Sequence, residues 1–91
     1  MKIVIDRERI TWRKLREELV LMHLDTGAYY SLNDTGILIW ESLADGQAYD
    51  SIIDAIVKEF EVDRETVIKD FERLVNELAD QGLVEIIESD A

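Results

Sequence analysis

The spacing of apolar residues changes near residue 33, and this change restricts the fold more than any other feature of the sequence. Before it, apolar and polar residues occur in short runs that are typical of β-strands. We predict a three-stranded antiparallel meander from Ile10–Leu15, Leu19–Leu24 and Tyr29–Leu32. Gly27 lies in the turn before the third run. Residues 1–9 are expected to add a short strand or a loose arm.

After residue 33 the apolar residues recur at helical spacing and predict three helices. Asn33 is the expected N-cap of the first helix, which the Asp-Gly pair at 45–46 ends. The second covers Tyr49–Phe60. The third has Asp63 as its predicted N-cap and ends where Gly82 can form a Schellman motif. The run "LVEII" after it is a candidate final strand.

The predicted order is three strands followed by three helices. Strands and helices that are segregated along the chain indicate an α+β fold. The last two helices, joined by a short connection, resemble a helix-turn-helix. The length of 91 residues predicts a single domain over residues 1–91.

The charge of the chain is strongly acidic and uneven. The net charge is -11, with +2 over residues 1–24 and -13 over residues 25–91. A winged-helix transcription regulator is the alternative from another functional class, but the predicted third helix, residues 63–81, has a net charge of -3. An acidic surface repels a phosphate backbone, so we expect no binding to nucleic acid. Neutral or basic partners fit this surface better.

We find no set of residues that predicts catalysis. The chain has no cysteine, and its one histidine, His23, falls within a predicted strand. The acidic residues are spaced as on solvated helix surfaces, without the spacing of a calcium loop. We therefore expect no enzyme activity, no metal and no cofactor. No signal peptide or membrane-spanning run is apparent, which predicts a cytoplasmic protein without membrane contact.

The third predicted strand carries two adjacent tyrosines. Tyr30 and Leu32 would share one face, and Tyr29 and Ser31 the other. This strand is the last of its meander, so its outer edge would have free backbone groups. An extended peptide could pair there, with alternate side chains entering pockets between the sheet and a helix.

The run "LDTGAYYSLNDTGILIWESLADG", followed by "SIIDAIVKEFEVDRETVIKDFERLVNELADQGLV", resembles the PqqD-like family. Members of this family are also called recognition elements of ribosomally synthesised, post-translationally modified peptides (RiPPs). The resemblance extends from about Trp12 to Val84. It depends on the combined pattern of the turn glycine, the aromatic-x-Leu-Asn strand end, Gly36, Ile39-Trp40, the Asp-Gly pair and the closing Gly-Leu-Val. One departure is Ala48, where relatives often have a Ser or Thr.

The resemblance implies a winged helix-turn-helix fold that binds no DNA and has no catalytic activity. It implies that the leader segment of a precursor peptide is bound as an added strand beside the third strand, in a groove shared with the third helix. The protein would present this peptide, as a chaperone does, to a modifying enzyme or a leader peptidase.

The site residues follow from the same resemblance. The pairing strand would be Tyr29, Tyr30, Ser31 and Leu32. Which side of the third helix lines the groove is our own inference, and the candidates are Arg64, Val67, Ile68, Phe71, Glu72 and Val75, some of them core residues.

Two biosynthetic systems use a free-standing domain of this kind. In lasso-peptide biosynthesis it works with a cysteine leader peptidase and a cyclase. In pyrroloquinoline quinone biosynthesis it works with a radical enzyme. The run "LDTGAYYSLN" is more similar to the lasso-peptide members.

Overall fold

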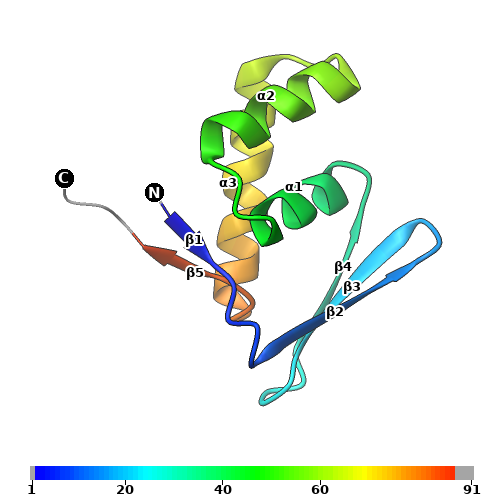
Figure 1. Ribbon diagram of the computed structural model, residues 1–91, viewed down its shortest axis with the longest axis vertical. Helices are drawn as coiled ribbons and strands as arrows, with labels where there is room; N and C mark the ends of the chain where they lie inside the picture. The colour runs from blue at the N-terminus through cyan, green and yellow to red at the C-terminus, as the bar shows by residue number, and fades with distance from the viewer. Residues whose placement is uncertain (1, 88–91) are drawn as a thin grey trace.

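The structure is a computed structural model that describes residues 2–87. Three strands and three helices follow one another in the predicted order, and a short strand precedes and follows them (Figure 1). The elements are β1 (Lys2–Val4), β2 (Ile10–Leu15), β3 (Glu18–His23), β4 (Tyr29–Asn33), α1 (Thr35–Ala44), α2 (Tyr49–Phe60), α3 (Arg64–Asp80) and β5 (Glu85–Ile87).

The strands form two separate antiparallel sheets. The larger has the order β2-β3-β4, which confirms the predicted meander. In the smaller, β1 pairs with β5. Residues near the start of the chain thus form a strand, and "LVEII" supplies its partner. Pairing of the two ends holds the C-terminal segment beside the N-terminal one (Figure 1).

The connection from β4 to α1 differs from our prediction. Asn33 is the last residue of β4, and Asp34 occupies the N-cap position without a side-chain capping hydrogen bond. The φ angle of Asp34 is 43°. Because the chain turns sharply from strand to helix, Asp34 combines this positive φ with a ψ of -113°, which lies outside the left-handed helical region and is strained for a residue with a Cβ.

The third helix has the predicted ends. The side chain of Asp63 accepts a hydrogen bond from the backbone N–H of Thr66 at 3.2 Å. At the other end Gly82 has a φ of 74°. The N–H of Leu83 then donates to the carbonyl of Leu78 at 2.8 Å, as in a Schellman motif.

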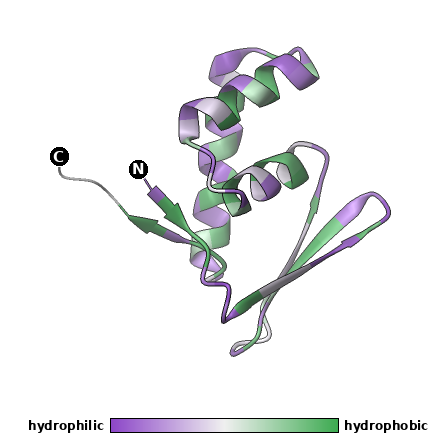
Figure 2. Cartoon of the chain, in the orientation of Figure 1, coloured by the Kyte–Doolittle hydropathy of each residue, from purple (hydrophilic) through white to green (hydrophobic). Residues whose placement is uncertain are grey.

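The core lies between the larger sheet and the helices. Trp40 of α1 is fully buried, and the ring of Trp12 from β2 packs edge-to-face against it at 5.3 Å between centroids. Between α2 and α3, the ring of Phe71 from α3 makes a similar contact with Tyr49 of α2 at 5.2 Å between centroids. Figure 2 shows that green, apolar segments alternate with polar ones along the helices, as expected for amphipathic helices around one core.

Candidate functional site

The outer edge of β4 is open. Within residues 2–87, β3 is the strand that pairs with β4, and no strand lies on its other side. The N–H of His23 donates to the carbonyl of Ala28, whereas the N–H of Leu24 donates to the carbonyl of Arg9, the residue just before β2. Backbone groups of successive residues point to opposite sides of a strand. The backbone groups of Leu19 and Leu21 therefore point towards β4, as those of His23 do.

This alternation determines which residues of β4 are available. In the register, Leu21 pairs with Tyr30 and Leu19 with Leu32. The backbone groups of Tyr30 and Leu32 are therefore used by β3. Those of Tyr29, Ser31 and Asn33 point away from the sheet and can pair with an added strand.

A groove runs beside this edge, between β4 and α3, with a volume of about 360 Å³. We call it the edge groove. It is lined by Tyr30, Ser31, Leu32, Asn33, Asp34, Thr35, Gly36, Ile39, Asp70, Arg73, Leu74 and Glu77. Its apolar lining comes from three side chains: Leu32 of β4 and Leu74 of α3 on the two walls, and Ile39 of α1 between them along the chain. This lining suits an apolar side chain of an extended ligand.

Gly36 determines how closely α1 approaches β4. A Cβ atom at this position would lie 3.1 Å from Cδ2 of Leu32. A larger residue would therefore displace Leu32, which is 4% exposed and forms part of the apolar lining. Glycine at this position leaves that part of the groove unobstructed.

One hydrogen bond connects the two walls of the edge groove. The hydroxyl of Tyr30 on β4 donates to the carboxylate of Glu77 on α3. This hydrogen bond, and then partial burial, raise the pKa of Tyr30 above its ordinary value. The bond positions α3 beside the sheet and holds the Tyr30 ring on the helix side of β4.

The edge groove is acidic towards solvent. Asp34, Asp70 and Glu77 contribute carboxylates, and Arg73 is the cation in its lining. Arg73 lies 3.6 Å from Asp70 as an exposed ion pair. The charge around the apolar lining therefore favours a ligand that carries basic residues.

The sequence-predicted residues of β4 lie at this site. Tyr30, Ser31 and Leu32 line the edge groove. Tyr29 lies on the opposite face of the sheet, where 70% of its surface is exposed. The backbone N–H and carbonyl of Tyr29 nevertheless point away from β3, so they can pair with an added strand.

The helix residues that we predicted lie elsewhere on α3, outside the lining of the edge groove, and their contact with a peptide stays a prediction. Val67, Phe71 and Val75 are buried in the core. Arg64 forms an ion pair with Asp54 of α2. None of these four residues lines the edge groove.

Ile68 and Glu72 also lie outside the edge groove. Ile68 packs against the core from a half-buried position, and Glu72 is exposed. Successive side chains of an α-helix point in directions that differ by about 100° around the helix axis. Both residues therefore lie across the core stripe from the face that borders the groove.

Sequence reasoning missed the face of α3 that does line the groove, Asp70, Arg73, Leu74 and Glu77. These residues recur at i, i+3, i+4 and i+7, as residues on one helix face do. The available signal was Leu74, an apolar residue at the margin of the core stripe with polar neighbours on that same face.

His23 has a structural role in the turn before β4. Its Nδ1 accepts hydrogen bonds from the backbone N–H groups of Asp25 at 3.1 Å and Thr26 at 3.3 Å. In the part of the chain that the structure describes, no group of three or more His, Asp or Glu residues could hold a metal ion. No helix among residues 2–87 is long and apolar enough to cross a membrane.

The fold and the edge groove define a small winged-helix protein whose open strand edge, rather than its third helix alone, forms the candidate site. The chain belongs to the PqqD family: the family described as "Coenzyme PQQ synthesis protein D (PqqD)" matches residues 18–84. The comparison with curated proteins gives no significant match.

Two solved structures are similar over nearly the whole chain. One is described as "TbiB1 in Complex with the TbiA(beta) Leader Peptide". It is 36% identical, with a TM-score of 0.84, and the match covers 98% of this chain and 100% of the other. The second is described as "Lasso peptide synthetase B1 complexed with the leader peptide". It is 27% identical, with a TM-score of 0.84 and coverage of 94% and 100%.

Proposed function

We propose that this protein binds the leader segment of a ribosomally synthesised precursor peptide in lasso-peptide biosynthesis. The leader would pair with the outer edge of β4 as an added strand, with alternate side chains entering the edge groove. The observation that carries this proposal is the outward backbone of Tyr29, Ser31 and Asn33 beside an apolar-lined groove.

The comparisons support the lasso-peptide system over pyrroloquinoline quinone biosynthesis. Both similar structures contain a leader peptide, and one is named "Lasso peptide synthetase B1". The PqqD family name alone would fit either system.

We infer that the protein is a non-catalytic cytoplasmic domain, comprising residues 1–91, that presents the leader to an enzyme. That enzyme would be a leader peptidase of the cysteine protease class or another modifying enzyme. The proposed peptide-contacting residues of β4 are those predicted from the sequence. On α3 we now assign this role to the face of Asp70, Arg73, Leu74 and Glu77. The buried Val67, Phe71 and Val75 would support that face from the core.

A titration followed by NMR tests the proposal. A synthetic leader peptide is added to the ¹⁵N-labelled protein, and the shifts of backbone amide signals are mapped. We expect the largest shifts at residues 29–36 and 70–77. Saturable binding with shifts confined to α2, or to β2, would contradict the proposed site. No binding by cognate leader peptide at hundreds of micromolar would contradict the proposed function.

A mass-spectrometric assay tests the absence of catalysis. Purified protein is incubated for hours with the complete precursor peptide, and we expect the mass of the peptide to stay unchanged. Cleavage or modification of the precursor by the protein alone would show that it is an enzyme.

A further inference from the structure

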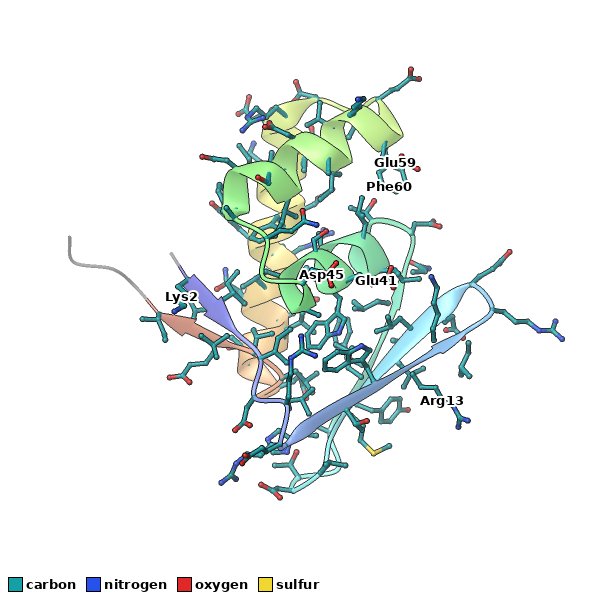
Figure 3. All side chains as sticks on the ribbon, viewed as in Figure 1. Lys2, Arg13, Glu41, Asp45, Glu59 and Phe60 are labelled. Atoms are coloured by element: carbon teal, nitrogen blue, oxygen red, sulfur yellow. The ribbon has the colours of Figure 1, made fainter. Side chains whose placement is uncertain are left out.

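A second groove lies between α1 and α2, and the leader-binding proposal does not use it. We call it the α1–α2 groove. It has a volume of about 610 Å³ and is lined by Glu17, Asp34, Ile37, Leu38, Glu41, Ala55, Glu59 and Phe60. Figure 3 shows Glu59 and Phe60 at the C-terminal end of α2 and Glu41 on α1.

The lining of the α1–α2 groove combines an apolar centre with an acidic rim. Ile37, Leu38 and Ala55 are half-buried, and Phe60 is 39% exposed. Phe60 is a large aromatic side chain at the end of a helix, where a charged residue would serve solubility better. Its exposure beside other apolar side chains is typical of a contact surface.

Four carboxylates surround this apolar centre, from Glu17, Asp34, Glu41 and Glu59. Lys14 is one cation nearby, and its Nζ lies 3.8 Å from Glu41. The described lining of the α1–α2 groove contains no Lys or Arg, so the rim stays acidic after this ion pair is counted. A second copy of the chain would bring the same carboxylates against each other, which opposes self-association. The complementary ligand is a segment with apolar side chains flanked by Lys or Arg.

The α1–α2 groove and the edge groove lie on opposite sides of α1. Thr35, Gly36 and Ile39 face the edge groove, and Ile37, Leu38 and Glu41 face the α1–α2 groove. Asp34, at the corner between β4 and α1, is the one residue that borders both. Two ligands could therefore bind at the same time without a steric conflict, yet lie next to each other.

We propose that the α1–α2 groove is the docking surface for a basic, apolar segment of the enzyme that receives the leader-bound peptide. The identity of this partner rests on the proposed function, because a protein that presents a peptide needs a contact that leaves the peptide site occupied. The groove itself is assigned by its charge, its apolar centre and its position across α1 from the open edge.

Two synthetic amphipathic peptides test the groove directly. Each has 14 or so residues with leucines at helical spacing; one carries lysine and the other glutamate at all remaining positions. They are added to ¹⁵N-labelled protein that is already saturated with leader peptide. We expect the lysine peptide to shift the amides of residues 34–41 and 55–60 without displacing the leader, and the glutamate peptide to shift none of them.

Two variants in the groove test the contact, and a third variant outside it is the matched control. Phe60→Ser removes the exposed ring, and Glu59→Lys reverses one rim charge. Each should lower the affinity for the lysine peptide by about fivefold, the size expected for one exposed apolar or ionic contact. Glu8→Lys changes the net charge equally but lies in the turn before β2, outside the groove. It should change the affinity by less than about twofold, a surface charge effect.

Three results would overturn the docking proposal. The first is a lysine peptide that binds elsewhere or competes with the leader. The second is an equal effect of Glu8→Lys and Glu59→Lys, which would show attraction to net charge alone. The third is a concentration-dependent shift at residues 37–41 and 55–60 without peptide, which would assign the groove to a second copy. Failure of the leader itself to bind is seen in the first titration and concerns the proposed function instead.

Discussion

At the scale of single residues, the direction of the backbone in β4 decides which residues can bind a peptide strand. Ser31 faces outward with both its N–H and its carbonyl, whereas its neighbours Tyr30 and Leu32 use theirs to pair with β3. The Ser31 side chain has a separate role, since its hydroxyl donates to Glu18 at 2.7 Å. Backbone and side-chain contributions at this residue can therefore be separated by mutation.

We predict that Ser31→Pro weakens leader binding by about tenfold, because it removes one outward hydrogen-bond donor worth about 1–1.5 kcal/mol. Ser31→Ala keeps that donor and should stay within about threefold of wild type. Fluorescence anisotropy with a labelled leader measures the affinity, and circular dichroism checks the fold. Equal affinities of the two variants would exclude strand addition at Ser31.

The phenol of Tyr30 predicts a pH effect on stability. Its hydrogen bond to Glu77, and then burial, raise the pKa of Tyr30 above the ordinary value of 10.0. The folded state therefore disfavours the phenolate, so this stabilisation is complete below pH 10 and is lost as the pH rises through the folded-state pKa. We expect the free energy of unfolding to fall more steeply above pH 10 in wild type than in Tyr30→Phe. Urea titrations between pH 8 and 11 measure this difference; parallel curves would contradict it.

At the scale of secondary-structure elements, α3 presents different faces to different partners. The face with Val67, Phe71 and Val75 packs into the core, and the face with Leu74 borders the edge groove. Leu74 and Val75 are consecutive residues, so their side chains differ in direction by about 100°. The same substitution at the two positions should therefore have different effects.

We predict that Leu74→Glu lowers the affinity for leader peptide by about tenfold or more while the protein stays folded. A carboxylate there would replace an apolar contact and add to the acidic charge around the edge groove. Val75 is 1% exposed, and Val75→Glu should lower the free energy of unfolding by about 3–5 kcal/mol, as an unpaired buried charge does. Urea unfolding and anisotropy measured on both variants test this. If Val75→Glu is stable but does not bind leader peptide, the peptide contacts the face of α3 that contains Val75, as first predicted.

At the scale of the whole molecule, the acidic charge separates this protein from DNA-binding winged helices of similar shape. The net charge is -11, and the open edge groove has three carboxylates and one arginine in its lining. A helix-turn-helix that reads DNA places Arg and Lys against phosphates and base edges. The same arrangement of helices here carries an acidic surface, and the strand edge is the binding element that we propose instead.

We predict no measurable binding to duplex DNA. A gel-shift assay with mixed-sequence duplex at low salt is the most permissive measurement, because electrostatic attraction to phosphates is strongest there. A basic winged-helix protein in the same gel is the positive control. A discrete complex at micromolar protein would restore the transcription-regulator alternative.

Local signals in the sequence were enough to predict the order of the elements, the meander and both ends of α3. These features depend on neighbours within about five residues: alternation in the strands, the Asp63 cap, and Gly82 with its positive φ. The strand that carries the open edge followed from its place at the end of the meander. The cap of α1 was misplaced by one residue, since the corner after β4 depends on how α1 packs across the sheet.

Only the tertiary structure decided which face of α3 borders the open edge. The apolar stripe of α3 is wide enough to contain both core residues and Leu74, and periodicity alone does not distinguish them. The rotation of the helix about its axis is set by contacts from distant parts of the chain: Phe71 against Tyr49, and Glu77 against Tyr30. Such contacts join residues far apart in sequence, so no local pattern contains them. The sequence by itself therefore determined the elements and their order, and long-range packing determined which side chains meet at the groove.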